Sequence, residues 1–111
     1  MKVALLGGTG AVGQRFVQML SRHPWFELTV ITGKTSVGKR YEEAAKWMLE
    51  TDMPEDVKDM VVQETKVENL KGVDLVFSAL PSKEAKTFER ELLKRGIPLV
   101  SNASALRMDP L

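Results

Sequence analysis

Residues 1–13 read Met1-Lys2-Val3-Ala4-Leu5-Leu6-Gly7-Gly8-Thr9-Gly10-Ala11-Val12-Gly13. The stretch 2–6 is mostly apolar and contains no turn-forming residue, which is typical of a buried parallel strand. The glycines lead into a predicted helix over 11–22. Its apolar residues should fall mainly on one face; they are Val12, Phe16, Val17, Met19 and Leu20. A strand, a glycine turn and a helix are the context in which G-x-G-x-x-G predicts a dinucleotide site.

The glycine spacing indicates how such a site would work. Residues 8–13 fit G-x-G-x-x-G, and Gly7, Gly10 and Gly13 also fit G-x-x-G-x-x-G. The first glycine allows a tight turn, Gly10 allows a pyrophosphate to approach the backbone, and Gly13 allows the helix to pack closely on the strand. The helix N-terminus offers unpaired N–H groups and partial positive charge to the phosphates. The alternative is a glycine turn that only links the strand to the helix.

The composition sets limits on fold and function. A chain of 111 residues forms one domain at most, and a complete doubly wound dinucleotide fold usually needs more. The net charge of +1 gives no basis for binding nucleic acid or a membrane. We expect neither a signal peptide nor a membrane span. The absence of cysteine excludes disulfides, cysteine metal ligands and a cysteine nucleophile within these residues. A cytoplasmic protein is the default expectation.

The loop after the second predicted strand, 26–31, bears on cofactor choice. In NAD-preferring sites an Asp or Glu at this point binds the ribose hydroxyls. Residues 32–40 contain no carboxylate, but they contain hydroxyl groups and the cations Lys34, Lys39 and Arg40. Such groups would bind a 2′-phosphate, which an acid would repel. The loop therefore predicts NADP rather than NAD, and the alternative is an ordinary solvated basic loop.

The rest of the chain alternates between predicted helices and predicted strands. We expect a helix over 41–50, a loop or short helix over 51–59, a short strand over 60–63, a turn over 66–72, a strand over 73–80, a helix over 82–95 and a strand over 97–100. In the helix 82–95 the core-facing residues should be Ala85, Phe88, Leu92 and Leu93. This alternation predicts an α/β fold: a Rossmann-like parallel sheet with flanking helices, here incomplete.

Three further groups of residues need an interpretation. Ser78 and Ala79 close an apolar and therefore central strand. The mostly polar residues 101–104 follow the last strand, at the edge where parallel sheets bind ligands. Trp47 fits a core or interface anchor better than a ligand platform. His23, the one histidine, follows a helix, where packing and the helix dipole explain it better than catalysis.

Four motifs together resemble one enzyme family. They lie at 7–16, 38–47, 77–82 and 101–108, reading GGTGAVGQRF, GKRYEEAAKW, FSALPS and SNASALRM. Their order and separation resemble the N-terminal part of the aspartate-semialdehyde dehydrogenases, and the second is most similar to the archaeal and fungal branch. The resemblance covers nearly all 111 residues but only the first part of the family's length. It implies a single N-terminal NADP-binding domain over 1–111.

The resemblance also implies a reaction. Members of the family carry out the NADPH-dependent reductive dephosphorylation of aspartyl-4-phosphate to aspartate semialdehyde, toward lysine, threonine and methionine. A cysteine thiolate forms a thioester, hydride from the nicotinamide reduces it, and a histidine serves as acid and base. An arginine binds the substrate phosphate. The full-length enzyme would bind a small-molecule substrate and form a homo-oligomer. The contacts for both would come mainly from a catalytic and dimerisation domain that this chain lacks.

Site residues follow by position. The family pattern implies Thr9, Gly10, Ala11 and Val12 at the pyrophosphate, with Gly7 and Gly13 shaping the turn. It implies Thr35 and Ser36 at the 2′-phosphate, to which we add Lys34 and Lys39 on electrostatic grounds. It implies Ser78, Ala79, Leu80 and Pro81 along the cofactor, Asn102 near the nicotinamide and Arg107 at the substrate phosphate. For Arg107 the alternative is a surface arginine past the last strand.

The sequence departs from the family in one large respect. It contains no cysteine, and its histidine does not lie in the family's catalytic segment. We therefore expect this chain alone to be inactive. Two alternatives stay open: the same domain of a related reductase acting on N-acetyl-glutamyl phosphate or malonyl-CoA, and a stand-alone NADP-binding module without catalysis. A following segment with a cysteine and then a histidine would exclude the module.

Overall fold

The computed structural model describes residues 1–21, 23–34, 36–50, 52–80 and 82–101. Five parallel strands form one sheet in the order β3-β2-β1-β4-β5. The strands are β1 (Lys2–Leu6), β2 (Glu27–Gly33), β3 (Gln63–Glu64), β4 (Leu75–Ser78) and β5 (Leu99–Ser101). This order equals five of the six strands of the doubly wound dinucleotide fold, whose order is 3-2-1-4-5-6. The predicted Rossmann-like class is confirmed.

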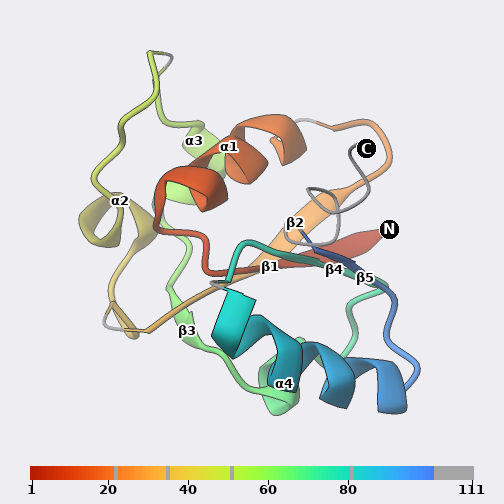
Figure 1. Ribbon diagram of the computed structural model, residues 1–111. Helices are drawn as coiled ribbons and strands as arrows, with labels where there is room; N and C mark the ends of the chain where they lie inside the picture. Colours follow the sequence, from red (N-terminus) through yellow and green to blue (C-terminus); the bar gives the residue numbers. More distant parts are fainter. Residues whose placement is uncertain (22, 35, 51, 81, 102–111) are drawn as a thin grey trace, which may run out of the picture.

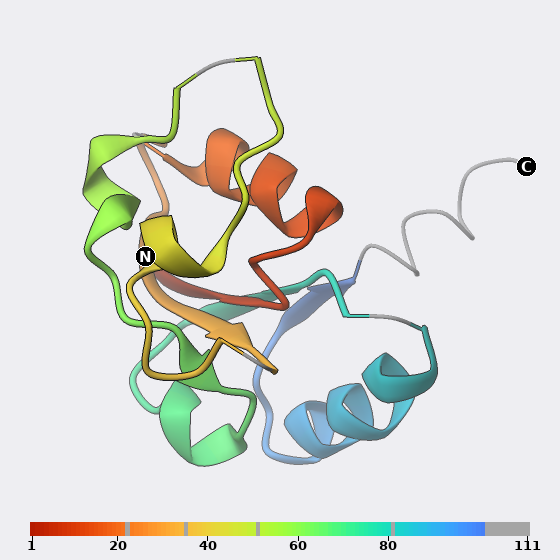
Figure 2. The ribbon, with the colours of Figure 1, turned by 90° about the vertical axis from the view of Figure 1, so that its left-hand side faces the viewer.

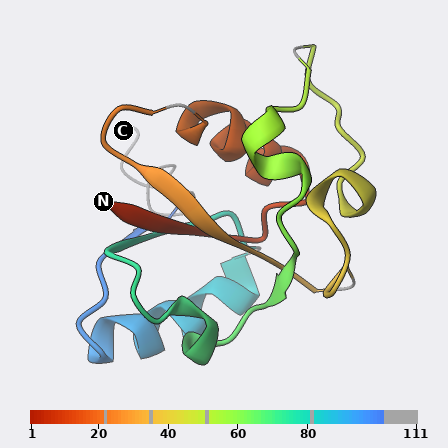
Figure 3. The ribbon, with the colours of Figure 1, turned by 180° about the vertical axis from the view of Figure 1, so that it is seen from behind.

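Helices cover both faces of the sheet (Figures 1 and 2). One face carries α1 (Ala11–Leu20), α2 (Tyr41–Ala44) and α3 (Glu55–Lys58), and the other carries α4 (Ser82–Lys94) beside the short 3₁₀ helix η1 (Val67–Leu70). Figure 3 shows the same three layers from behind. The helices within the described ranges are all too short or too polar to cross a membrane.

The first strand lies at the centre of the sheet and is buried on both faces. Val3 and Leu5 pack in the core beneath α1, whereas Ala4 and Leu6 pack in the core above α4. This double burial explains why residues 3–6 are apolar without alternation. The other predicted interior strand, β4, lies between β1 and β5.

Two helices present less apolar surface to the core than the sequence predicts. On α1, Val17 and Leu20 are buried, but Val12 and Met19 are 42% and 63% exposed. On α4, Leu92 is buried and Leu93 is 63% exposed. The prediction of a single apolar face was therefore wrong at these positions, because each helix buries only the narrow stripe that touches the sheet.

The predicted helix over 41–50 is also wrong beyond its first turn. The last helical bond joins the Ala45 N–H to the Tyr41 carbonyl, and Ala45 itself is extended. The Lys46 carbonyl and the Met48 N–H are instead bonded to the side chain of Gln14. A tertiary partner therefore takes the backbone groups that a continuing helix would have paired. Trp47 packs partly against the core, as predicted for an anchor.

The other boundaries move by a few residues. The second strand continues through Thr32 to Gly33, so the basic loop begins at Lys34. The third strand comprises only Gln63–Glu64, while Val61 forms a single antiparallel bridge to Arg40. The last strand begins at Leu99 rather than at 97. The lengthening of β2 matters for function because it places Thr32 beside the glycine turn.

Candidate functional site

A cleft of about 580 Å³ opens at the carboxyl ends of the strands. Its lining comes from the glycine turn, the ends of β2 and β3, the segment after β4, and α4; the residues are Gly7, Thr9, Gly10, Gly33, Lys34, Glu64, Thr65, Ala79, Leu80 and Phe88. The strand order reverses at β1, because β2 and β3 lie on one side of it and β4 and β5 on the other. The cleft therefore lies at the switch point where doubly wound sheets bind ligands. The volume lies within the usual range for a small-molecule site.

The glycine turn is built on one left-handed residue and one tight contact. Gly7 has φ of +69°, which side-chain-bearing residues rarely adopt, so it makes the turn out of β1. A Cβ at Gly13 would lie 2.3 Å from the Gly7 carbonyl oxygen and 2.6 Å from the Gly8 Cα. Gly13 therefore lets α1 pack on the turn itself, rather than on the strand as its position in the motif predicts.

Gly10 has the opposite surroundings. A Cβ there would meet no atom within 4 Å, so the space beside its backbone is open. Gly10 precedes α1, and the first bond of that helix runs from the Gln14 N–H to the Gly10 carbonyl. The amides of Ala11 and Val12 thus have no partner within the helix. No acidic residue lies within 11–14 to compete for the positive end of the helix dipole.

Thr32, at the end of β2, fixes the start of the turn. Its backbone carbonyl accepts the Gly8 N–H at 3.0 Å, and its hydroxyl oxygen accepts the Gly7 N–H at 3.3 Å. The Thr65 hydroxyl donates to the same Thr32 oxygen at 2.8 Å. Thr32 is fully buried, so these bonds are not in competition with water. The ends of three strands are thereby joined at the base of the cleft.

Two buried side chains hold the carbonyls of the turn. The Tyr41 hydroxyl donates to the Gly8 carbonyl at 2.6 Å, and the Gln14 amide donates to the Thr9 carbonyl at 3.1 Å. Both side chains are fully buried. Burial raises the pKa of the Tyr41 phenol above its ordinary value, so this group stays protonated and remains a donor.

The basic loop reaches the cleft at one described cation. Lys34 lines the cleft, whereas Ser36 and Lys39 do not. Two backbone hydrogen bonds tie the later part of the loop to Val62. The Gly38 N–H donates to the Val62 carbonyl, and the Val62 N–H donates to the Lys39 carbonyl. Thr35, the other predicted 2′-phosphate residue, lies outside the described residues.

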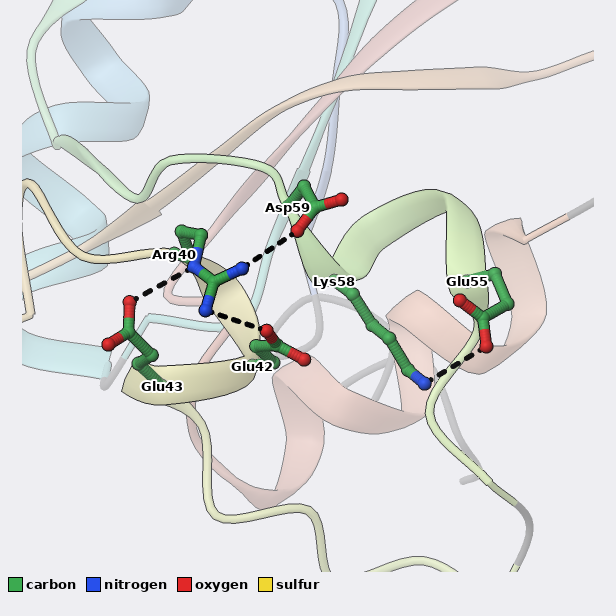
Figure 4. A network of polar contacts seen from close by, with 6 residues as sticks. All are labelled: Arg40, Glu42, Glu43, Glu55, Lys58 and Asp59. Atoms are coloured by element: carbon green, nitrogen blue, oxygen red, sulfur yellow. Dashed lines mark hydrogen bonds and ion pairs between the residues drawn. The ribbon is translucent and has the colours of Figure 1, made fainter.

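Arg40, counted in the sequence as a third cation of this loop, serves a different purpose. Its guanidinium lies 2.9 Å from Glu42, 3.2 Å from Glu43 and 3.1 Å from Asp59 (Figure 4). The hydrogen bond to Glu43 and the charge of Glu42 raise its pKa. Three carboxylates offset the charge of this guanidinium, and the contacts link α2 to the end of α3. Lys58 pairs with Glu55 in the same figure.

The segment after β4 forms the opposite wall. Ala79 and Leu80 line the cleft, and Ala79 is fixed by its N–H bond to the Leu6 carbonyl. Ser78 is buried, and its hydroxyl oxygen accepts the Leu80 N–H at 3.4 Å, so it shapes the wall from behind. The remaining predicted positions, Pro81, Asn102 and Arg107, lie outside the described residues.

Sequence reasoning missed several lining residues: Gly33, Glu64, Thr65 and Phe88. Glu64 and Thr65 could have been found, because they follow the predicted strand 60–63 and so belong at the carboxyl edge of the sheet. Phe88 was assigned to the core, and it does pack there with one side. Across the described ranges, His, Cys, Asp and Glu side chains form no group of three that could hold a metal ion.

Comparison with known proteins agrees with this geometry. Residues 2–111 match the family model described as semialdehyde dehydrogenase, NAD binding domain. The aspartate-semialdehyde dehydrogenase of Methanothermobacter thermautotrophicus is 49% identical over 111 residues, which cover 99% of this chain and 32% of that protein. A malonyl-CoA reductase (NADP) of Metallosphaera sedula is 38% identical over 98% of this chain and 31% of its own length.

A solved structure is similar as well. The crystal structure of aspartate-semialdehyde dehydrogenase with NADP from Candida albicans superposes with a TM-score of 0.87 at 42% identity, covering 97% of this chain and 31% of that one. The chain thus spans about a third of the length of the relatives it matches. Because the family model matches nearly every residue, and the sheet order and glycine turn agree with it, the chain belongs to the semialdehyde dehydrogenase family, with residues 2–111 corresponding to its NAD-binding domain.

Proposed function

We propose that this chain is the NADP-binding domain of an aspartate-semialdehyde dehydrogenase. The observation that carries the proposal is the glycine turn, which places the open backbone of Gly10 and the N-terminus of α1 beside one cleft. Relatives with that enzyme's name are 36–49% identical over nearly the whole chain. The alternative of a related acyl reductase is supported by the malonyl-CoA reductase at 38% identity.

The described residues fit the phosphates of a dinucleotide. In this proposal the backbone of Thr9, Gly10, Ala11 and Val12 binds the pyrophosphate, because the helix N-terminus supplies unpaired amides and partial positive charge. The turn is kept in shape by Gly7 and Gly13. The open space at Gly10 admits the ligand at the point where a Cβ would have stood.

The remaining contacts follow the family pattern. Lys34 binds the 2′-phosphate together with Thr35 and Ser36, and Lys39 contributes charge at longer range. Ser78, Ala79, Leu80 and Pro81 form the wall along the cofactor, and Asn102 lies at its nicotinamide end. Arg107 binds the phosphate of the substrate. Lys34, Ala79 and Leu80 are supported by their place in the cleft.

The complete enzyme would reduce an acyl phosphate. NADPH, when bound, supplies a hydride to the acyl group, and phosphate leaves. We propose aspartyl-4-phosphate as the substrate and the synthesis of lysine, threonine and methionine as the setting, in a homo-oligomeric enzyme. The chain contains no cysteine. The nucleophile therefore belongs to sequence outside these residues, and this chain binds the cofactor without catalysing the reaction.

The test is a paired titration of the folded chain with NADP and NAD. Trp47 is half-buried and adjoins the Gln14 contacts, whereas Trp25 is 74% exposed before the amino end of β2, away from the cleft. A Trp25→Phe variant therefore isolates the useful fluorophore. Far-UV circular dichroism first establishes that the chain is folded. We expect saturable quenching or enhancement with NADP and weaker binding of NAD; equal affinities would contradict the 2′-phosphate assignment, and no binding would contradict the proposal for this chain.

A further inference from the structure

Gln14 makes more polar contacts than its place in a helix requires. It lies in the first turn of α1, yet its side chain is fully buried. The amide nitrogen donates to the Thr9 carbonyl at 3.1 Å and to the Lys46 carbonyl at 2.9 Å, and the amide oxygen accepts the Met48 N–H at 2.8 Å. One side chain thus joins the glycine turn to a distant segment, because Lys46 and Met48 lie 32 and 34 positions after Gln14 in the chain.

These bonds determine which way the peptides of the turn face. The Thr9 carbonyl belongs to the same planar trans peptide as the Gly10 N–H, so the two groups point in opposite directions. Because Gln14 holds the carbonyl on the buried side, the Gly10 N–H faces away from that side. Tyr41 holds the Gly8 carbonyl in the same manner and so orients the Thr9 N–H. Thr9 and Gly10 both line the cleft.

We propose that Gln14 is a positioning residue for pyrophosphate binding. Its amide aims the Gly10 N–H at the ligand and links that orientation to residues 46–48, so that Trp47 senses the state of the turn. This inference rests on the proposed function, because it assigns a role within the same nucleotide site. Gln14 itself touches no ligand; it acts through the backbone of the turn.

The alternative is that Gln14 only stabilises the fold. Ligand dissection separates the two roles, because adenosine 2′-monophosphate carries the 2′-phosphate of NADP but no pyrophosphate. If Gln14 positions the turn, substituting it should weaken the binding of NADP and leave the binding of adenosine 2′-monophosphate unchanged. If Gln14 is purely structural, the substitution should change neither affinity while the chain stays folded, or should change both affinities together.

The central variant is Gln14→Met, which keeps the side-chain length and the helix propensity but removes the amide. The matched control is Gln18→Met, the same substitution one turn later at an exposed position of α1. For Gln14→Met we expect the Kd for NADP to rise about tenfold, the size of effect produced by one lost charge-assisted contact. The Kd for adenosine 2′-monophosphate should stay within about twofold of the unsubstituted chain, as should both constants for Gln18→Met.

A second variant, Gln14→Glu, covers the case in which the apolar substitution prevents folding. The new carboxyl group has the shape of the amide but donates a hydrogen bond only when protonated. Burial beside two carbonyl oxygens raises its pKa, so NADP affinity relative to the unsubstituted chain should recover as the pH falls. Taking the ratio at each pH removes the titration of the ligand's own phosphate. Gln18→Glu is the control and should show a flat ratio.

The outcomes are distinct for the two proposals. If the unsubstituted chain is folded and fails to bind NADP, the proposed function falls and this inference falls with it. If that chain binds NADP but Gln14→Met binds it equally well, or loses NADP and adenosine 2′-monophosphate in parallel, only the positioning role is overturned. A selective loss of NADP binding, with recovery of Gln14→Glu at low pH, supports it.

Discussion

The Tyr41 hydroxyl donates a 2.6 Å hydrogen bond to the Gly8 carbonyl, joining two residues that lie 33 positions apart in the chain. Tyr41 begins the short helix α2, and its own N–H donates to the Met60 carbonyl at 2.8 Å. The residue therefore ties the glycine turn to the segment between α3 and β3. The glycine turn is held in place by contacts that are remote in sequence, and removing them should affect both stability and binding.

Tyr41→Phe removes a single buried oxygen and leaves the Gly8 carbonyl without its donor. An unpaired buried acceptor costs about 1–3 kcal/mol, so we expect the free energy of unfolding to fall by about that amount. Urea unfolding followed by far-UV circular dichroism measures the change. Thr29→Val is the control, because the Thr29 hydroxyl donates to the Val3 carbonyl at 3.3 Å in a half-buried position. A loss for Tyr41→Phe no greater than that of Thr29→Val would contradict the expectation.

The same phenol makes the fold sensitive to alkaline pH. Burial raises the pKa of Tyr41 above its ordinary value of 10.0, so the neutral form is favoured in the folded chain. The resulting stability is fully present below pH 10 and is lost as the pH rises from the unfolded pKa through the folded one. We expect the free energy of unfolding to fall with pH above about 10, and to fall less steeply in Tyr41→Phe. Tyr41 is the one tyrosine, so tyrosinate absorbance follows its ionisation directly. Ionisation at the ordinary pKa in the folded chain would contradict this prediction.

Two glycines of the turn should lose different amounts of stability when they are replaced by alanine. Gly13→Ala places a Cβ 2.3 Å from the Gly7 carbonyl oxygen, against backbone that has little room to move. We expect a loss of about 1–3 kcal/mol or more, the usual cost of overpacking. Gly10→Ala meets open space at a negative φ, so it should cost about 1 kcal/mol or less through the weaker helix cap.

The Gly10 substitution should affect NADP binding much more than it affects stability. The Cβ at position 10 occupies the space through which we propose that the pyrophosphate approaches. Gly10→Ala should therefore weaken NADP binding about tenfold or more in a chain of nearly normal stability. Thermal unfolding and the Trp47 titration measure the two effects on the same samples. Unchanged NADP affinity in Gly10→Ala would show that the ligand does not approach at this point.

Sequence reasoning succeeded where local pattern and local structure coincide. Residues 3–6 are apolar because β1 is buried on both faces, and the glycine spacing follows from the turn and the close approach of α1. It failed where a distant residue decides. Residues 41–50 have the composition of a helix, but Gln14 bonds the backbone of 46 and 48, and nothing in the local sequence records that competition.

The sequence could not separate the three cations of the basic loop, for the same physical reason. Lys34, Lys39 and Arg40 are equivalent in a sequence, but their neighbours in space differ. Arg40 is surrounded by three carboxylates, one of them at Asp59 just after α3, while Lys34 lies in the wall of the cleft. Only the fold distinguishes a cation that stabilises a helix from one that can meet a phosphate.

Lys34→Glu should therefore change cofactor preference more than any other reversal of charge in this loop. The new carboxylate would repel a 2′-phosphate but accept the ribose hydroxyls of NAD, as acids do at the end of the second strand in NAD sites. A charged hydrogen bond is worth about 1.5–3 kcal/mol, so the ratio of the Kd for NADP to that for NAD should rise about tenfold to a hundredfold. Lys39→Glu, outside the cleft lining, should raise it less. Lys71→Glu makes the same charge change on the exposed surface before the amino end of β4, and it should leave the ratio unchanged. Equal responses of Lys34→Glu and Lys71→Glu would mean that the loop acts only through net charge and that the 2′-phosphate binds elsewhere.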